Sequence, residues 1–154
     1  MALIDFTVSH QFAAPSRAVW DEMIDWPSHA NWIPATRMEL DTDDSQVVGA
    51  TFTGYTGYKK LALVDRMRIS AIDWDEATGE GNCEVEKLGP VLQGRAGFVV
   101  SPNGNGSTVE WFEQVTVPYL PPLLAPIVNK LSATGFSLGM RRLAKIVEKK
   151  HPAH

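Results

Sequence analysis

The sequence predicts an α+β fold in which a curved, seven-stranded antiparallel sheet wraps around one long C-terminal helix. Three observations predict it. An alternating apolar pattern opens the chain, short strand-like segments separated by glycine-rich turns fill its middle, and a broad apolar helical face closes it. Two short helices are expected directly after the first strand. Because the chain has 154 residues, 44% of them hydrophobic, we expect a single domain over residues 1–154.

The first strand and the two short helices are indicated by periodicity and by prolines. In "LIDFTVSHQF" apolar and polar side chains alternate, which is typical of a half-buried strand. Pro15 then opens a helix whose apolar residues lie at helical spacing. Pro27 ends that helix, because the residue before a proline avoids the helical conformation. Pro27 also begins a second short helix, which Pro34 closes. The two helices should cover one end of the sheet.

Residues 36–118 are predicted to form six further strands. The strand-like segments are "ATRMELD", "VVGATFTGYTG", "LALVDRMRISAIDW", "CEVEKL", "VLQGRAGFVVS" and "STVEWFEQVTVP". The turn signals "DEATGEGN", "GP" and "PNGNG" separate the last four segments. Short successive strands joined by such turns favour an antiparallel meander.

A long helix is predicted from about Leu123 to Lys149. Its apolar residues fall on two stripes that are offset around the helix axis and together make a broad apolar face. One stripe holds Leu124, Val128, Leu131, Gly135 and Leu138, and the other holds Phe136, Met140, Leu143 and Val147. A face of this width suits a helix that a curved sheet surrounds.

Composition and charge exclude several classes of protein. A net charge of -4 with scattered Lys and Arg disfavours a nucleic-acid-binding protein. The single cysteine, Cys83, cannot form an internal disulfide, and no spacing predicts a metal site or a cofactor. The N-terminus lacks the pattern of a signal peptide, and the longest uncharged run is broken by four prolines. We therefore expect a cytoplasmic protein with no integral membrane segment.

Several segments resemble the START-like, or SRPBCC, superfamily, whose members have the helix-grip fold. These segments are "AAPSRAVWDEMIDWPSHANWIP", "GATFTGYTG", "CEVEKLGPVLQG" and "VEWFEQVTVP". Within the superfamily, the chain is most similar to bacterial proteins labelled polyketide cyclase/dehydrase, and the similarity covers essentially its whole length. The resemblance implies a hydrophobic cavity between sheet and helix that binds lipids, sterols, quinones, polyketides or plant hormones; a few members are cyclases. Relatives of this type often place a histidine in the fifth strand, where this sequence has Lys87, so no catalytic role is carried over from that position.

Two hairpin turns predict which side chains share a face of the sheet. We centred one turn on the "GP" dipeptide, which places Lys87 opposite Leu92, and the other on "GN" in "NGNG". Both turns put the same set of residues on one face: Cys83, Val85, Gly94, Ala96, Phe98, Trp111, Glu113 and Val115. This set is mostly apolar and small, so we expect it to be the concave face, with room for a ligand or a closely packed helix.

Glu113 is the one carboxylate on this face, and burying it costs several kcal/mol unless it is paired or protonated. Lys87 has the right charge, but this register places it roughly 16 Å away between Cα atoms, and we interpret it as a solvated strand end. His10 has the inward parity of the first strand, which pairs with the last strand in the helix-grip fold. A His10–Glu113 pair beside the cavity is therefore the candidate arrangement for a functional role. The alternative is a structural carboxylate near the rim, with His10 partly in solvent.

The predicted function is the binding of a small hydrophobic molecule, such as a lipid, quinone or polyketide, between the sheet and the C-terminal helix, with Glu113 orienting the ligand. The residues expected to contact it are Trp32, Phe52, Tyr55, Cys83, Val85, Ala96, Phe98, Trp111, Glu113, Leu124, Val128, Leu131 and Gly135. Trp20, Trp26 and Trp32 are expected to cover the cavity, with Tyr58 near its mouth. Such aromatics can also belong to a plain core.

Two alternative functions stay open at this point. A cyclase, dehydratase or aldol-type enzyme would use Glu113 with His10 or a tyrosine as an acid–base pair. An interaction module would hold a protein or helix in its groove, and it would show a large exposed apolar patch and little enclosed volume. In each case the chain is expected to act as a monomer or homodimer.

Overall fold

The computed structural model describes residues 2–57 and 61–151, so Tyr58 lies outside the described residues. In chain order the elements are β1 (Ala2–Phe12), α1 (Ser16–Met23), the 3₁₀ helix η1 (Trp26–Asn31), β2 (Thr36–Leu40), β3 (Thr51–Thr56), β4 (Leu63–Asp75), β5 (Glu80–Leu88), β6 (Gln93–Asn103), β7 (Gly106–Val117), the 3₁₀ helix η3 (Pro122–Leu124) and α2 (Ala125–Lys150). This order confirms the predicted α+β class, with seven strands, two short helices after the first strand and one long C-terminal helix.

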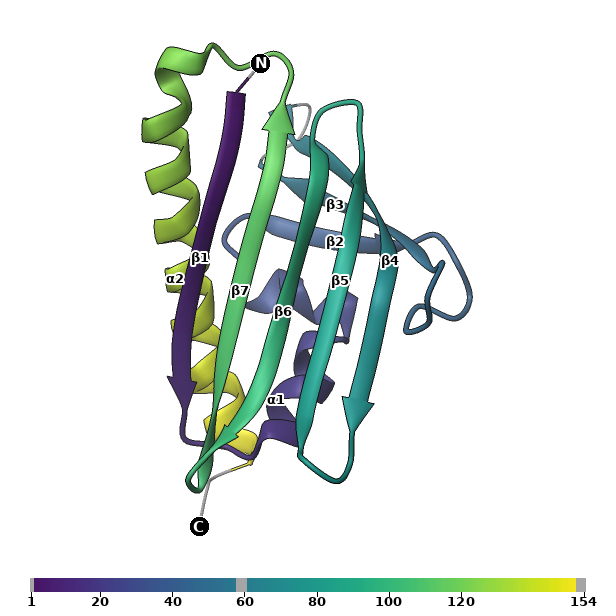
Figure 1. Cartoon of the computed structure of the whole chain (residues 1–154), viewed down its shortest axis with the longest axis vertical. Helices are drawn as coiled ribbons and strands as arrows, with labels where there is room; N and C mark the ends of the chain where they lie inside the picture. Colours follow the sequence, from purple (N-terminus) through teal and green to yellow (C-terminus); the bar gives the residue numbers. More distant parts are fainter. Residues whose placement is uncertain (1, 58–60, 152–154) are drawn as a thin grey trace.

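The seven strands form one antiparallel sheet in the order β1-β7-β6-β5-β4-β3-β2. The sheet curves strongly, so that β2 and β3 lie behind the other strands and run across them in Figure 1. Helix α2 lies on the same side, alongside β1, and α1 covers the lower end of the sheet. This is the arrangement of a helix-grip fold. No helix in the described part of the chain is long and apolar enough to cross a membrane.

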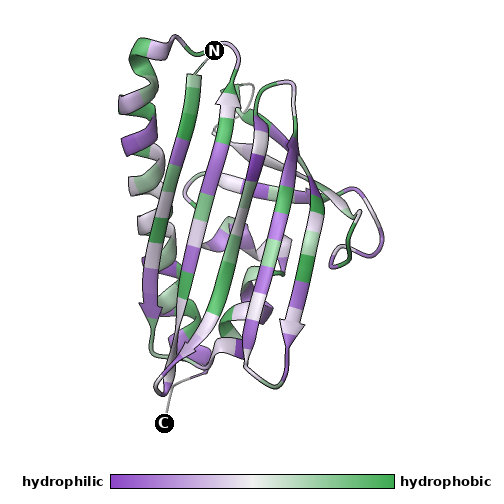
Figure 2. Cartoon of the chain, in the orientation of Figure 1, coloured by the Kyte–Doolittle hydropathy of each residue, from purple (hydrophilic) through white to green (hydrophobic). Residues whose placement is uncertain are grey.

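Inward and outward side chains alternate along the strands as the sequence predicts. In β1 the buried positions include Ile4, Phe6 and Val8, and exposed positions separate them. Figure 2 shows the same alternation as green and purple bands along the strands. The predicted concave set is buried at every position except Gly94, which is exposed. Alternation with a period of two therefore fixes which face of the sheet carries the core.

One of the two predicted hairpin registers is correct and the other is shifted. The β6–β7 register is confirmed, with Ala96 opposite Glu113. The β5–β6 register is wrong by two residues, because Leu88 pairs with Gln93 and the loop between them has more than two residues. Lys87 consequently lies opposite Gly94 and comes closer to the level of Glu113 than predicted. An even shift keeps every side chain on its predicted face.

The three tryptophans of the early helical stretch belong to the core. Trp26 stacks on Phe52, with ring centroids 4.4 Å apart and planes 15° apart. Trp32 is fully buried beneath α2 at Gly139. Trp20 packs its ring against Gly81 of β5. These residues do not line the cavity between α2 and the sheet; they fill the core beneath α1 and η1, and Gly81 on the facing strand leaves space for the indole ring of Trp20.

Substituting Gly81 with alanine is expected to destabilise the protein by about 1–3 kcal/mol, because the core has no space for the added methyl group. A Cβ at Gly81 would lie 2.7 Å from both Cδ2 and Cζ3 of the Trp20 ring. Chemical denaturation would measure the loss. Gly135→Ala is the matched control, since a Cβ there meets nothing within 4 Å and alanine favours a helix. Equal stability of the two variants would contradict this account of the Trp20 packing.

Only part of the apolar face predicted for α2 is covered. Met140, Leu143 and Val147 of the second stripe are buried. In the first stripe, by contrast, Leu131 is 67% exposed and Leu138 is 42% exposed. The C-terminal half of α2 packs against the core, with Gly139 in contact with Trp32. A cavity separates the N-terminal half of α2 from the sheet. The first stripe is therefore divided: Val128 and Gly135 line the cavity, whereas its leucines are exposed to solvent.

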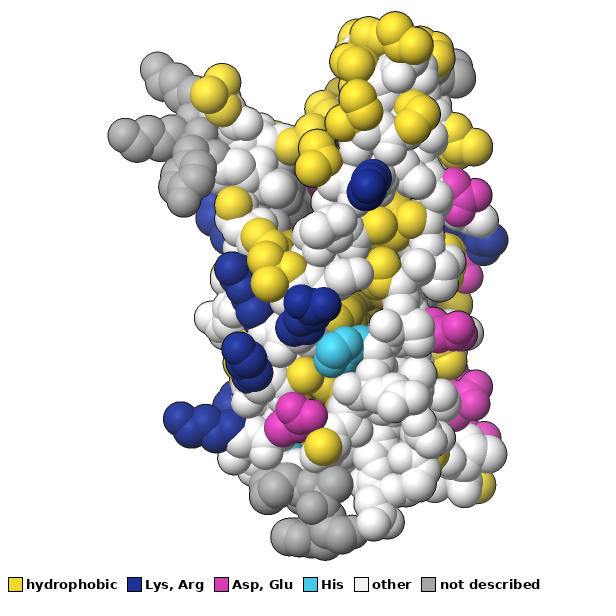
Figure 3. Space-filling model, turned by 90° about the vertical axis from the view of Figure 1, so that its left-hand side faces the viewer, with side chains coloured by type: hydrophobic (Ala, Val, Ile, Leu, Met, Phe, Trp, Pro, Cys, Tyr) yellow, Lys and Arg dark blue, Asp and Glu magenta, His cyan; other side chains and the backbone are white. Residues whose placement is uncertain are grey.

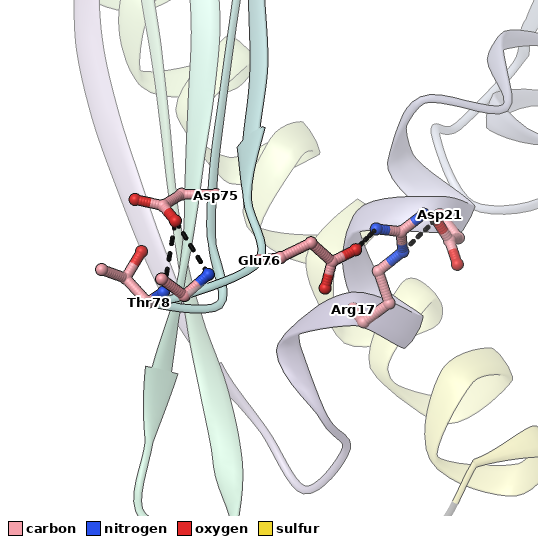
Figure 4. A network of polar contacts seen from close by, with 6 residues as sticks. Arg17, Asp21, Asp75, Glu76 and Thr78 are labelled. Carbon is pink, nitrogen blue, oxygen red and sulfur yellow. Dashed lines mark hydrogen bonds and ion pairs between the residues drawn. The ribbon is translucent and has the colours of Figure 1, made fainter.

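A small polar network ties α1 to the turn between β4 and β5 (Figure 4). The Arg17 guanidinium lies 3.0 Å from Asp21 on its own helix and 2.9 Å from Glu76 in the turn. Within the turn, Asp75 accepts hydrogen bonds from the backbone N–H groups of Ala77 and Thr78. These groups are exposed, so each ion pair stabilises the fold by no more than about 1 kcal/mol.

Candidate functional site

A cavity of about 360 Å³ lies between the N-terminal half of α2 and the concave face of the sheet. Its volume falls within the range of roughly 300–1,000 Å³ that is typical of small-molecule sites. The wall is mostly apolar and comes from β1, β2, β3, β4, β7, α2 and the loops beside them. It is formed by Ile4, Phe6, Ile33, Pro34, Thr36, Thr56, Leu63, Asp65, Leu92, Glu113, Val115, Val117, Leu120, Val128, Ser132, Gly135 and Phe136.

Small side chains on α2 account for the space. Val128, Ser132 and Gly135 lie at helical spacing and face the cavity. A Cβ built at Gly135 would meet no atom within 4 Å. A helix that carried leucine at these positions would fill the volume, as the C-terminal half of α2 does with Leu143. The cavity is therefore encoded in the sequence of α2 as well as in the curvature of the sheet.

Three charged side chains meet at the floor of the cavity, one each from β4, β5 and β7. Lys87 Nζ donates a hydrogen bond to Asp65 Oδ2 and lies 3.9 Å from Glu113 Oε1. The three side chains are 5% (Lys87), 13% (Asp65) and 9% (Glu113) exposed. We call these residues the buried triad. The interpretation of Lys87 as a solvated strand end, out of reach of Glu113, is therefore wrong.

The pKa shifts of the triad follow from burial and mutual charge. Burial acts to lower the pKa of Lys87, but the charges of Glu113 and Asp65 outweigh it and the pKa is raised. Burial raises the pKa of Glu113, and the charge of Asp65 adds to that effect, while Lys87 opposes it. Lys87 is therefore a firmly held cation, and the proton affinity of Glu113 is above that of an ordinary glutamate.

The two carboxylate residues of the buried triad line the cavity, and Lys87 does not. Asp65 and Glu113 line the cavity, and they are the only charged residues among the described ones that do. Asp65 Oδ1 is buried and has no hydrogen-bond partner among the described residues. The hydroxyl of Thr36 is already committed, since it bonds to Pro34 O and to the hydroxyl of Thr56, and Ser132 of α2 adds one more hydroxyl-bearing residue to the wall. The buried triad is thus the main polar end of an apolar cavity.

Of the residues predicted to contact a ligand, Glu113, Val128 and Gly135 line this cavity. Six others surround a separate space of about 20 Å³ deeper in the core, together with the inner side of Lys87: Phe52, Cys83, Val85, Ala96, Phe98 and Trp111. That space holds about one water molecule. Burial raises the pKa of the Cys83 thiol to about 12, which makes it inert. The structure therefore places these six residues around the smaller space and not on the wall of the larger cavity.

The remaining predicted positions lie away from the cavity wall. Trp32 is buried beneath α2, and Tyr55 packs under the Arg37 guanidinium, 4.2 Å from its ring centre, beside a shallow surface hollow. Leu124 and Leu131 face solvent. The helical stripe predicted these leucines on the inner face of α2, but the α2 residues that line the cavity are Val128, Ser132, Gly135 and Phe136.

These features can be compared with known proteins. The profile of a family described as "Polyketide cyclase / dehydrase and lipid transport" matches residues 4–148. The chain belongs to this family. Membership confirms the resemblance noted from the sequence. No curated protein matches the chain.

Several solved structures have the same fold as this family member, although their sequences are only 14% identical to it. TTHA0849 from Thermus thermophilus has 14% identity and a TM-score of 0.72, with 95% of this chain and 98% of that chain covered. Protein CV1439 from Chromobacterium violaceum has 14% identity and a TM-score of 0.65, with 94% and 97% covered. Ara h 8.0201 has 14% identity and a TM-score of 0.63, with 96% and 99% covered.

The pair of His10 and Glu113, which the enzyme alternative could use as acid and base, is not formed. In the β1–β7 register Phe6 lies opposite Glu113, and His10 lies opposite Val109. His10 and Glu113 are therefore four residues apart along the paired strands, roughly 13 Å. His10 instead packs edge-on against Phe12, and Glu148 and Arg141 are the charges that act on it. No turn joins β1 to β7, so the sequence offered no means to set this register.

Most of the apolar wall was absent from the predicted contacts, and Asp65 is the charged wall residue that the sequence-based prediction missed. It shares the inward parity of Met67 and Ile69 along β4, and that alternation was a usable signal. Among the described residues, no group of three His, Cys, Asp or Glu side chains could hold a metal ion. The carboxylates of the buried triad are therefore held by Lys87.

Bulky apolar side chains gather outside the cavity, at η3 and the first turns of α2. We call this region the apolar tip; it comprises Tyr119, Leu123, Leu124, Ile127 and Leu131. Leu123 is 87% exposed. Figure 3 shows these side chains in yellow at the upper end of the molecule, beside a notch in the surface. An exposed apolar patch, which the interaction-module alternative predicts, is thus present beside a cavity of about 360 Å³ that opens to solvent.

Proposed function

We propose that this protein binds a small, largely apolar molecule, such as a lipid, quinone or polyketide, in the cavity between α2 and the sheet. One observation supports this above the others: an apolar cavity of about 360 Å³ ends at two buried carboxylates, Asp65 and Glu113. Apolar walls supply affinity through the hydrophobic effect, and a few polar groups at one end orient the ligand. The family description, which includes lipid transport, agrees with such a role.

The direct experiment is native mass spectrometry of the protein purified from its own host, followed by organic extraction. A stoichiometric apolar passenger is the expected result, and the extraction gives its identity. A protein that carries no passenger and that binds none of a panel of lipids, quinones and aromatic polyketides would overturn the proposal.

Filling the cavity from α2 tests where the ligand binds. Gly135→Leu is expected to weaken the binding of a neutral apolar dye such as Nile red by about tenfold or more, because the new side chain occupies ligand volume. The fold should tolerate it, since a Cβ at Gly135 meets no atom within 4 Å and leucine favours a helix more than glycine does. Fluorescence titration measures the affinity, and thermal unfolding reports on the fold.

Thr134→Leu is the matched control, because it adds a leucine one position earlier on the exposed side of α2. It should leave dye affinity unchanged. Equal affinity of the wild type and Gly135→Leu would show that the dye binds elsewhere, and would count against this cavity as the site.

A further inference from the structure

The polar end of the cavity presents hydrogen-bond acceptors and keeps its cation behind them. Asp65 and Glu113 face the cavity, whereas Lys87 lines the smaller core space on the other side. The Lys87 ammonium is already engaged: it contacts Asp65 Oδ2, and Met67 Sδ lies 3.4 Å from it. A ligand in the cavity therefore meets carboxylate oxygens before it meets the ammonium group.

One of these oxygens lacks a partner. Asp65 Oδ1 is buried without a hydrogen bond to any described residue, and the residue that carries it lines the cavity. A buried acceptor without a partner is costly, and a donor that reaches it recovers that cost. An alcohol or phenol hydroxyl is such a donor. A carboxylate has no proton to offer, so it would leave Asp65 Oδ1 unpaired.

The net charge of the buried triad also disfavours an anionic ligand. Two carboxylates and one ammonium give the triad a formal charge of about −1 when all three groups are ionised. No cationic side chain of the described residues lines the cavity to offset it. An anionic head group would therefore be desolvated next to like charge, which is strongly unfavourable in a site of low dielectric constant.

From these contacts we infer that the cavity selects apolar molecules whose polar end is a hydroxyl that donates a hydrogen bond to Asp65, and that it rejects carboxylates of the same length. This inference rests on the proposed function, because it concerns the same cavity. It gives the ligand a chemical class: long-chain or aromatic alcohols and phenols, as opposed to fatty acids and other carboxylic acids.

The test compares two molecules of equal chain length, 1-decanol and decanoate, as competitors of Nile red on the full-length wild-type protein at pH 7.5. We expect 1-decanol to bind about tenfold or more tightly than decanoate, because only the alcohol can donate a hydrogen bond to the Asp65 carboxylate. Equal affinity, or tighter binding of decanoate, overturns the inference and leaves the proposed function standing. Failure of the dye, the alcohol and the acid to bind overturns both.

A charge-neutral variant identifies the residue responsible. Asp65→Asn keeps the shape of the side chain and removes its charge, so the preference for the alcohol should fall about tenfold, to near unity. Glu86→Gln is the control: it removes a carboxylate from β5, the neighbour of β4, but its side chain pairs with Arg68 on the exposed face. A preference that persists in Asp65→Asn would overturn the assignment to Asp65. If Asp65→Asn does not fold, the comparison of 1-decanol with decanoate on the wild-type protein still tests the inference.

Discussion

Lys87→Met is expected to destabilise the protein by about 3–5 kcal/mol at neutral pH, because it leaves two buried carboxylates without their cation. Lys87 is the only partner within ion-pair distance of both Asp65 and Glu113 among the described residues. Methionine has a similar length, so the variant removes charge with little change of volume. Denaturation in guanidinium chloride measures the loss. Acidification should reduce it, since protonation of the two carboxylates removes the unpaired charge.

Arg68→Met is the matched control for this prediction. Arg68 pairs with Glu86 across the same two strands, β4 and β5, but both side chains are about half exposed, so the expected loss is at most about 1 kcal/mol. A loss in Lys87→Met as small as that in Arg68→Met would mean that water reaches the triad. The cavity could not then have the dry polar end on which the proposed ligand selectivity depends.

Replacing the whole triad separates stability from ligand recognition. Asp65→Leu combined with Lys87→Met and Glu113→Leu removes all three charges, and such replacements are often neutral or stabilising. The triple variant should therefore recover most of the stability that Lys87→Met loses, while its preference for alcohol over carboxylate disappears. On this view the fold could do without the buried charges, and their presence at the floor of an apolar cavity is explained by recognition of a ligand.

The elements of the fold could be predicted because local signals set them. Alternation identified β1, and prolines at positions 15, 27 and 34 bounded the two short helices. The set of side chains on the concave face was also predicted correctly. Side chains alternate between the two faces of a strand, so a register error of two residues leaves each of them on the same face. The β5–β6 register was predicted wrongly, because the loop between Leu88 and Gln93 is longer than the two-residue turn that we assumed. That shift concealed the approach of Lys87 to Glu113.

The site was harder to predict than the fold because it depends on volumes and on strands far apart in the sequence. Both Asp65 and Glu113 have inward parity, but their convergence on Lys87 requires the order of β4, β5, β6 and β7 in the sheet and the curvature that brings them together. The position of the cavity depends on which half of α2 packs closely. The bulky tryptophans suggested a cavity near α1 and η1, whereas the small residues of α2, Ser132 and Gly135, mark where it lies.

His29 is expected to make the stability of the protein fall by about 3 kcal/mol as the pH drops from 6.5 to 4. Its side chain is fully buried between the rings of Trp26 and Trp32, and Nε2 donates a hydrogen bond of 2.7 Å to Met23 O. Burial lowers the pKa of His29 from 6.5 to about 4. Between these values the unfolded chain binds a proton that the folded chain excludes, so protonation favours unfolding. Above pH 6.5 both states are neutral at this site, and the full stability is present.

The measurement is the free energy of unfolding of the wild type and of His29→Gln across this pH range. Glutamine keeps a donor for Met23 O and does not titrate, so the wild type should lose about 3 kcal/mol more than the variant. The raised pKa of Glu113 acts in the opposite sense, but it is present in both proteins and cancels in the difference. His151→Gln, at an exposed residue beyond the end of α2, should keep the wild-type slope. Parallel curves for the wild type and His29→Gln would mean that His29 accepts a proton without unfolding, and that the aromatic core around η1 opens to water.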